Sequence, residues 1–432
     1  MFDRTIAPAI SPRRTWWRLL AAIPDSVRNA MMAGLYVLRH PLPIKRFADL
    51  YISAFPLKLL PRRQGKIAIT RVDNIGDFIL WLDGARAVRN RYPRPDYHLT
   101  LIASAKWSKF AESAALFDEV IAIDLERFFN DARYRRATCR GIARGRFETA
   151  INPTYSRGTW GDDFLVKATG ASMSIGHAGD LSNATRYGKR ITDRWYGELV
   201  SGAEPARHEL EKNWHFSKRF DPQAVLRSPK LERGMISRPP WLPDDNRYFV
   251  LFPGAAWPIK LWPIERFGEI AARIHAKTGW GGIVCGLASD SSAAQRLIAH
   301  VKDVPIMDAC GQTTLSELAG VIADAKVTVT NDTSAAHLAA ALSAPAVAIL
   351  GGGHFGRFLP YPSECGPANS ALRIACHSMP CYQCNWRCIH ARRPNDPGPC
   401  ITSVTVDDVW AIVARVLEAV REPYEVVNGR QF

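Results

Sequence analysis

Residues Lys326–Leu350, KVTVTNDTSAAHLAAALSAPAVAIL, decide the fold that this sequence predicts. The β-branched run Lys326–Thr330 predicts a strand, and the Ala- and Leu-rich run from about Thr333 to Leu342 predicts a helix. A second buried strand is expected over Ala346–Leu350. A helix that follows a strand presents free backbone N–H groups and the positive end of its dipole, which together suit a phosphate. The first turn of this helix is therefore a candidate phosphate site.

The same residues also allow a purely structural interpretation. Asn331 or Asp332 would then cap the helix, and His337, one turn further on, would be a buried core histidine. Local chemistry alone leaves both interpretations open.

A second unit of the same kind near the front of the chain favours a binding site. The strand Lys66–Thr70 leads through the turn RVDNIGD (Arg71–Asp77) into an amphipathic helix. Asp77 lies at the start of that helix, directly after a glycine that can relax the turn. Asp77 is either an N-cap or a functional carboxylate.

Strand and helix patterns alternate along most of the chain, which is typical of a parallel sheet covered on both faces. A stretch rich in Pro, Arg and Asp between about Asp221 and Asn246 predicts a linker, and the basic stretch Arg186–Arg194 is expected to be a loop. We therefore expect an α/β protein of two Rossmann-like domains facing across a cleft, with ligands at the carboxyl ends of the strands. The predicted parts are a basic amphipathic helical extension (1–65), two domains (66–225 and 246–403), and a helix (404–432) that crosses back to the first domain.

Charge and composition limit the partners. The chain has 432 residues, is 47% hydrophobic and carries a formal net charge of +15, and residues 1–65 contain 11 Lys and Arg against three acidic residues. Nothing resembles a nucleic-acid-binding motif, so the basic balance favours an anionic membrane surface or a phosphorylated substrate. No apolar run is long enough to span a bilayer, and arginines interrupt the N-terminal segment, so a cytoplasmic protein is expected. The amphipathic extension would lie in a lipid headgroup layer or pack on the body of the protein.

Three motifs resemble, in order and spacing, the ADP-heptose:lipopolysaccharide heptosyltransferases of glycosyltransferase family 9. They are RVDNIGD (Arg71–Asp77), PGAAWPIKLWP (Pro253–Pro263) and NDTSAAH (Asn331–His337). The resemblance implies a GT-B fold and an inverting, metal-independent transfer of heptose from ADP-heptose to a lipid-linked saccharide or, in some relatives, to a protein.

The resemblance also implies roles for individual residues. The family's catalytic base falls on Asp77, and its donor-phosphate lysine falls on Lys260. Its D-T-G-P-x-H nucleotide motif falls on Asp332, Thr333, Ser334, Ala335 and His337. Here Ser334-Ala335 replaces the usual Gly-Pro, and Ala255-Ala256 replaces residues that often carry hydroxyls. Either the nucleotide sugar itself or the way the protein holds it is therefore expected to differ from the family pattern.

Displacing a nucleoside diphosphate needs a base for the incoming hydroxyl and positive charge for the leaving group. The sequence contains no D-x-D, so no metal cofactor is expected for catalysis. Lys260, the helix start at Thr333 and Ser334, and His337 are the expected cations and donors. Asp332 is expected to cap the helix or to reach a sugar or ribose hydroxyl.

Residues Gly351–Gly356, GGGHFG, formally satisfy the G-x-G-x-x-G fingerprint of a nicotinamide-dependent enzyme. That fingerprint requires a helix to follow, and Pro360, Pro362 and Pro367 forbid one. A loop in which Gly351 and Gly353 let the backbone approach the diphosphate or sugar is the preferred interpretation.

Five of the nine cysteines lie between residues 376 and 400. Cys381, Cys384 and Cys388 have the spacing of a thiolate metal site, and with Cys400 as a fourth ligand they predict a structural zinc or iron. Some protein-modifying heptosyltransferases similar to this family carry an iron-binding finger of this kind. The alternative is a loop of reduced thiols.

The sequence thus favours an inverting glycosyltransferase that uses a nucleotide sugar, ADP-heptose in the first place, at the cytoplasmic membrane face. Its acceptor would be a cell-envelope lipopolysaccharide-type saccharide. A protein O-heptosyltransferase is the second hypothesis. A catalytically degenerate cysteine-cluster assembly module is the third.

Overall fold

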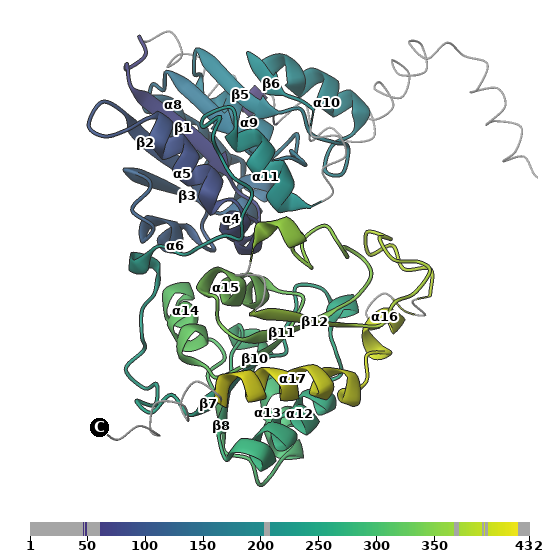
Figure 1. Cartoon of the computed structure of the whole chain (residues 1–432). Helices are drawn as coiled ribbons and strands as arrows, with labels where there is room; N and C mark the ends of the chain where they lie inside the picture. Colours follow the sequence, from purple (N-terminus) through teal and green to yellow (C-terminus); the bar gives the residue numbers. More distant parts are fainter. Residues whose placement is uncertain are drawn as a thin grey trace, which may run out of the picture.

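The computed structural model describes residues 61–202, 208–366, 371–390 and 396–421, together with Arg46, Ala48, Asp49 and Arg393. These residues form two six-stranded parallel sheets, which lie in the upper and lower halves of Figure 1. The two sheets have equivalent strand orders, each the order of a dinucleotide-binding fold. The predicted pair of Rossmann-like domains is confirmed.

The first sheet has the order β3-β2-β1-β4-β5-β6. Its strands are β1 (Lys66–Arg71), β2 (His98–Ser104), β3 (Glu119–Ile123), β4 (Thr149–Asn152), β5 (Met173–His177) and β6 (Glu198–Val200). The helical elements of this domain are α4 (Ile75–Leu80), α5 (Leu82–Arg91), α6 (Ser108–Glu112), α7 (Leu125–Asn130), α8 (Ala132–Arg144), α9 (Asp162–Thr169), α10 (Arg186–Thr192), η1 (Asp193–Trp195) and α11 (Glu209–Ser217). Side chains of β1 alternate between two cores, since Ile67 and Ile69 pack on the side of α4 and Ala68 packs on the side of α8 and α9.

The second sheet has the order β12-β11-β10-β7-β8-β9 and follows a connection that contains η2 (Arg233–Met235). Its strands are β7 (Tyr248–Phe252), β8 (Gly281–Val284), β9 (Ile306–Asp308), β10 (Thr328–Asn331), β11 (Ala346–Leu350) and β12 (Leu372–Cys376). The helical elements are η3 (Pro258–Lys260), α12 (Ile264–Thr278), η4 (Ala288–Asp290), α13 (Ser291–His300), α14 (Leu315–Asp324), α15 (Ser334–Leu342), η5 (Ser363–Cys365), α16 (Pro399–Thr402) and α17 (Val406–Arg421).

One apolar core runs from the first sheet into the second, and α4 and α15 form its junction. Phe78 on α4 is fully buried and stacks on Trp107, at 4.6 Å between ring centroids. Gly76 on the same helix faces α15 so closely that a Cβ there would lie 3.0 Å from the ring of His337. The two strand-to-helix turns that the sequence singled out therefore meet in space.

Two sequence predictions about helices are wrong. Residues 186–192 form α10, not a loop, because Thr185 caps the helix by accepting a hydrogen bond from the backbone N–H of Gly188 at 3.0 Å. The closing helix α17 does not cross back to the first domain. Val409, Val413 and Leu417 are buried in the core of the second domain, where α17 packs on α12 (Figure 1).

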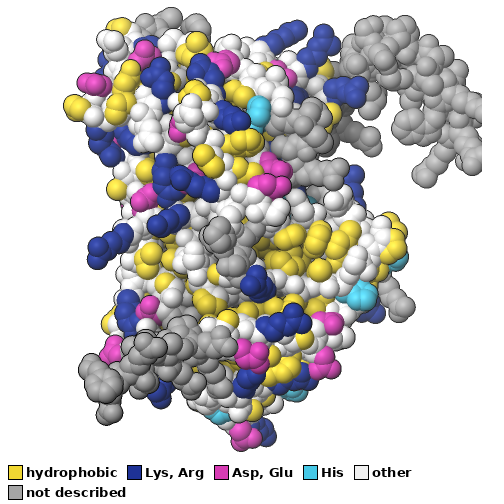
Figure 2. Space-filling model, in the orientation of Figure 1, with side chains coloured by type: hydrophobic (Ala, Val, Ile, Leu, Met, Phe, Trp, Pro, Cys, Tyr) yellow, Lys and Arg dark blue, Asp and Glu magenta, His cyan; other side chains and the backbone are white. Residues whose placement is uncertain are grey.

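The predicted amphipathic extension lies outside the described residues, apart from Arg46, Ala48 and Asp49. Asp49 is 8% exposed and pairs with Arg135 of α8, at 3.0 Å from its Nε, so this point of the segment packs on the body of the first domain. On the face shown in Figure 2, Lys and Arg are interspersed with acidic residues over both domains. None of the described helices is both long and apolar enough to cross a bilayer.

Candidate active site

A cleft of about 2110 Å³ separates the two domains at the carboxyl ends of their strands. Asp77 from α4 lines the first-domain side, and Lys260, Asp332 and the first turn of α15 line the second-domain side. Ligands of parallel α/β sheets bind at this edge. Asp77 and Lys260 therefore line the same cleft from its two sides.

Asp77 both caps the start of α4 and lines the cleft. Its carboxylate accepts a hydrogen bond from the backbone N–H of Asn74 at 3.2 Å, and its own backbone carbonyl accepts one from Nη2 of Arg71 at 3.0 Å. Burial raises the pKa of Asp77, Arg71 opposes that shift, and Glu209 adds to it. A carboxylate with a raised pKa is a stronger base than one in water.

Arg71 and Asp73, which belong to the same motif as Asp77, also line the first-domain side of the cleft. Only Asp77 was assigned a role from the sequence. Arg71 is 3% exposed, and its Nε donates to Asp73 at 3.1 Å. Burial raises the pKa of Asp73 well above its ordinary value; Arg71 opposes this, and the nearby carboxylates of Asp77 and Asp162 reinforce it.

Lys260 forms an ion pair with Asp332, at 2.7 Å between Nζ and Oδ2, with the two side chains 12% and 10% exposed. The same ammonium lies 5.5 Å from the ring centroid of Trp257 and 5.1 Å from that of Trp386. Aromatic faces and a carboxylate both attract a cation, so Lys260 is held in place at the cleft wall.

The expected cap of α15 is wrong. Asp332 pairs with Lys260, and Asn331 uses its amide to donate to the carbonyl of Pro253 at 2.6 Å. The cap is Thr333, whose hydroxyl accepts from the backbone N–H of Ala335 at 3.3 Å. Thr333 and Ser334 remain partly exposed at the cleft, as a phosphate-binding helix start requires.

His337 is buried and does not supply a positive charge. Burial lowers its pKa to about 4, which Lys260 reinforces and Asp332 opposes, so the ring is neutral at pH 7. Its Nδ1 lies 2.9 Å from the hydroxyl of Tyr361, and the two rings are stacked. The prediction of His337 as a cation is therefore corrected, and its ring lies at the cleft between Tyr361 and Gly76 of α4.

Gly351 and Gly353 do not open a path to a diphosphate. They are buried, and a Cβ at these positions would lie 2.9 Å and 2.2 Å from the ring of Trp386. The glycines are needed because an aromatic ring packs on the backbone, and neither lines the cleft. The prediction of these two residues as ligand contacts is wrong, because the rings of the cysteine-rich segment occupy the space beside them.

A connection between the domains completes the site. Glu209 of α11 is 7% exposed and accepts hydrogen bonds from Lys212 at 2.9 Å and from Nε of Arg357 at 3.1 Å. Arg357 comes from the second domain and also donates to the hydroxyl of Ser156 at 3.2 Å. Burial alone would raise the pKa of Glu209, but Lys212 and Arg357 outweigh it and lower that pKa. Glu209 is therefore ionised and ties the two domains together beside the cleft.

A family model described as glycosyltransferase family 9 (heptosyltransferase) matches residues 136–386. The chain belongs to this family. Among curated proteins, the family 9 chain is 29% identical over 140 residues to lipopolysaccharide heptosyltransferase 1 of Pseudomonas aeruginosa. The match covers 31% of this chain and 38% of the length of that relative.

Solved structures of the family share the whole fold. A family 9 glycosyl transferase from Veillonella parvula superposes with a TM-score of 0.65 at 17% identity, covering 83% of this chain and 99% of that chain. An Escherichia coli heptosyltransferase solved with ADP-2-deoxy-2-fluoro heptose gives a TM-score of 0.58 at 15% identity, covering 81% and 99%. The GT-B fold is thereby confirmed for this family 9 chain.

The cysteine cluster of this family 9 chain is not preassembled as a metal site. Cys381, Cys384, Cys388 and Cys400 are free thiols, and Cys400 accepts a hydrogen bond from the backbone N–H of Gly352 at 3.3 Å. Within the described residues, no group of three or more His, Cys, Asp or Glu side chains is placed to hold a metal ion. The hydrogen bond to Cys400 does not itself exclude a metal, because sulfurs that bind metals also accept such bonds. It is the placement of the thiols in the described part of the chain that does not match a formed zinc or iron site.

Sequence reasoning also missed three cleft residues, Asp162, Glu209 and Arg357. Asp162 had a detectable signal, since it is the first residue of the helix that follows β4, and Asp77 likewise lies in the first turn of the helix that follows β1. Glu209 and Arg357 lie 148 positions apart, and no local pattern indicates that they pair.

Proposed function

We propose that this family 9 chain is an inverting, metal-independent glycosyltransferase that moves a heptose from ADP-heptose to a hydroxyl of a lipopolysaccharide-type saccharide. The observation that carries this proposal is the charge arrangement across the cleft. Lys260 and the start of α15 lie on one side of the cleft, and Asp77 lies on the other. Such a pair of walls suits a reaction that needs a base on one side and an anion-binding site on the other.

In the proposed mechanism Asp77 removes the proton from the acceptor hydroxyl. That hydroxyl oxygen forms a bond to the anomeric carbon while the bond from this carbon to the diphosphate breaks on the opposite face, so the configuration inverts. General base catalysis of this kind contributes typically 10² to 10⁴-fold in rate. The raised pKa of Asp77 supports its role as the base.

The leaving diphosphate would be bound by Lys260 and by the free N–H groups at Thr333 and Ser334. An ammonium has three donors, so Lys260 can keep its contact with Asp332 and still donate to a phosphate oxygen. Asp332 would hold Lys260 in position, at the cost of reducing its net charge. The cations of the protein would thus replace the metal that many nucleotide-sugar enzymes use.

The place of action is part of the proposal. The basic segment 1–65 would bring the enzyme to an anionic membrane surface on the cytoplasmic side, where a lipid-linked acceptor is accessible. The curated relative from Pseudomonas aeruginosa, by its name a lipopolysaccharide heptosyltransferase, supports this class of acceptor.

The experiment is a transfer assay with the full chain, ADP-heptose and lipopolysaccharide that lacks heptose, followed by mass spectrometry of the saccharide. We expect one heptose to be added, and no transfer from GDP- or UDP-linked sugars. In a parallel thermal-shift assay, ADP at about one hundred times its dissociation constant should stabilise the fold by about 2.7 kcal/mol.

Two results would contradict the proposal. Heptose added only to a protein in the assay would establish the protein O-heptosyltransferase hypothesis. Absence of ADP binding, together with no transfer, would favour the degenerate assembly module.

A further inference from the structure

The cysteine-rich segment, residues 376–400, comes close to the donor side of the cleft at Trp386. The centroid of the Trp386 ring lies 5.1 Å from the ammonium of Lys260, although Trp386 itself does not line the cleft. An aromatic face attracts a cation that lies within about 6 Å of its centroid. Any effect of Trp386 on a ligand in the cleft therefore has to pass through a neighbour, and Lys260 is the neighbour that carries a charge.

Backbone hydrogen bonds and close packing fix the position of Trp386. The backbone N–H of Gln383 donates to the carbonyl of Gly352 at 2.7 Å. The backbone N–H of Asn385 donates to the carbonyl of Gly353 at 2.9 Å. The ring of Trp386 then packs directly on Gly353, where a Cβ would lie only 2.2 Å from it. The glycine loop and the cysteine-rich segment thus fit each other closely around this ring.

The backbone of the turn that carries Trp386 has an unusual conformation. Trp386 has a φ of 59°, in the left-handed region that large side chains rarely adopt. Gln383 and Asn385 also have positive φ values, of 68° and 51°. Such conformations cost free energy, persist only where the surrounding structure holds them, and cluster at ligand-binding sites. The turn is therefore shaped to place the indole ring.

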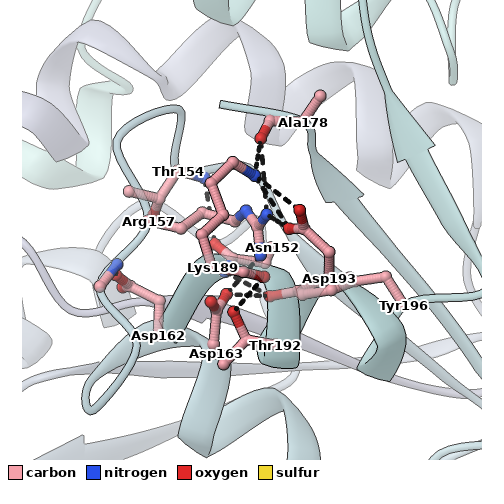
Figure 3. A network of polar contacts seen from close by, with 11 residues as sticks. Asn152, Thr154, Arg157, Asp162, Asp163, Ala178, Lys189, Thr192, Asp193 and Tyr196 are labelled. Atoms are coloured by element: carbon pink, nitrogen blue, oxygen red, sulfur yellow. Dashed lines mark hydrogen bonds and ion pairs between the residues drawn. The ribbon is translucent and has the colours of Figure 1, made fainter. Parts of the chain in front are cut away.

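A lysine of the first domain shows what an aromatic ring adds. Lys189 donates to the two carboxylate oxygens of Asp193, at 2.9 Å and 3.1 Å, and to the carbonyl of Ala178 (Figure 3). An ammonium has three N–H donors, so these contacts engage all of them. Among the described residues, Lys260 donates one hydrogen bond, to Asp332. A ring attracts the charge of Lys260 without taking up its other two donors.

We propose that the cysteine-rich segment completes the donor site, and that Trp386 is the positioning residue through which it acts. Trp386 keeps the ammonium of Lys260 at the cleft wall beside Asp332, with N–H donors free for the diphosphate. Trp257 supports the same ammonium from 5.5 Å and lines the cleft itself. A lysine held in this way loses less rotamer freedom when a phosphate binds, which increases affinity. This role of Trp386 rests on the proposed function, because its ligand is the diphosphate of the donor.

The test measures binding of ADP and of adenosine to the full chain by isothermal titration calorimetry. The variants are Trp386→Leu, which removes the aromatic face, and Trp386→Phe, which keeps one. The control is Trp214→Leu on α11, which removes a ring that lies 3.8 Å from the ammonium of Lys218, outside the cleft. The same titrations are made with Lys260→Met and with Lys260→Met/Trp386→Leu.

Trp386→Leu should weaken ADP binding by about 10-fold, and Trp386→Phe by less, because the ring of Phe attracts a cation less strongly than indole does. Adenosine affinity should stay unchanged in both variants, since adenosine has no phosphate for Lys260 to bind. Trp214→Leu should bind both ligands as the native chain does. Once Lys260 is replaced by Met, adding Trp386→Leu should not change ADP affinity further, because Trp386 acts through Lys260.

Three results would overturn this role of Trp386. They are equal ADP affinity in Trp386→Leu and the native chain, equal losses of ADP and adenosine affinity, and a further loss of ADP affinity when Trp386→Leu is added to Lys260→Met. If Trp386→Leu does not fold, Trp386→Phe decides by a loss confined to ADP. A native chain that binds no ADP would overturn the proposed function as well, whereas the three results above leave the proposed function standing.

Discussion

The two walls of the cleft differ in whether their buried polar side chains are paired with one another. On the second-domain wall the polar groups are paired with one another, as Lys260 is with Asp332 and His337 is with Tyr361. On the first-domain wall carboxylates are crowded, burial raises the pKa values of Asp73, Asp77 and Asp162, and several polar atoms have no partner among the described residues. A paired wall is set to bind a ligand without rearrangement, whereas buried carboxylates and unpaired polar atoms carry a free-energy cost in the folded chain.

Breaking the pairing of the second-domain wall should give the largest effect on stability. Lys260→Met leaves the buried carboxylate of Asp332 without its partner, so we expect the free energy of unfolding to fall by about 3 kcal/mol, measured by urea denaturation. ADP affinity should fall as well, because the phosphate loses its cation. In the double variant Lys260→Met/Asp332→Asn the stability should recover and the ADP affinity should not. Recovery of both would mean that Lys260 acts on the donor only through folding.

On the first-domain wall, in contrast, removing a buried charge should stabilise the fold. Burial raises the pKa of Asp162 to about 6 from an ordinary 3.8, so the folded chain binds more protons than the unfolded chain between these values. Stability therefore falls as the pH rises from about 4 to about 6 and stays reduced above that. Asp162→Asn removes this penalty, which is at most about 3 kcal/mol for a shift of about two units.

Thermal unfolding across the pH range checks this sign. Asp162→Asn should be more stable than the native chain at pH 8, and the difference should shrink toward pH 4. A variant that is less stable than the native chain at pH 8 would show that Asp162 has a structural role.

A substitution at Gly353 tests whether the loop Gly351–Gly356 takes part in donor binding on the second-domain wall. Gly353→Ala would place a methyl group against the ring of Trp386, so we expect a loss of about 1 to 3 kcal/mol from overpacking. ADP affinity should fall by a few-fold at most, because the displaced ring still lies beside Lys260. Gly141→Ala is the matched control, because a Cβ at that helical position meets no atom within 4 Å. A large loss of ADP affinity in Gly353→Ala but not in Gly141→Ala would show that this loop contributes to donor binding.

The contact that joins the two walls should have the smallest effect. Arg357→Ala removes hydrogen bonds to Glu209 and Ser156, and we expect about 1 to 2 kcal/mol lower stability in urea denaturation. Arg227→Ala, which removes an ion pair with Asp83 from a side chain that is 61% exposed, should cost less than about 1 kcal/mol. Equal losses in the two variants would argue against a specific connection between the domains at Arg357.

Local patterns predicted the fold well where they were strong. The strand Ala346–Leu350 has the predicted bounds, and the strand predicted over Lys66–Thr70 extends by one residue to Arg71, because both have a continuous buried apolar or β-branched pattern. The stretch that became α10 lacks such a period, and its start depends on a single threonine cap. The direction of α17 could not be predicted, because either domain could have buried its apolar face.

The candidate site could likewise be predicted only where a local motif carries the residue. Asp77 and Lys260 stand in motifs whose spacing marks strand-to-helix turns, and the structure brings both to one cleft. The partner of Lys260 and the pairing of Glu209 with Arg357 arise from contacts between distant segments. Gly353 was misassigned because a glycine beside a ligand and a glycine beneath a tryptophan look alike in sequence.

The central claim is that Asp77 acts on the acceptor and not on the donor. The most direct measurement is the single-turnover rate of heptose transfer from ADP-heptose by Asp77→Asn and by the native chain, with ADP affinity determined on the same samples. We predict a rate lower by about 10² to 10⁴-fold with an unchanged dissociation constant for ADP. A transfer rate equal to that of the native chain would contradict the account.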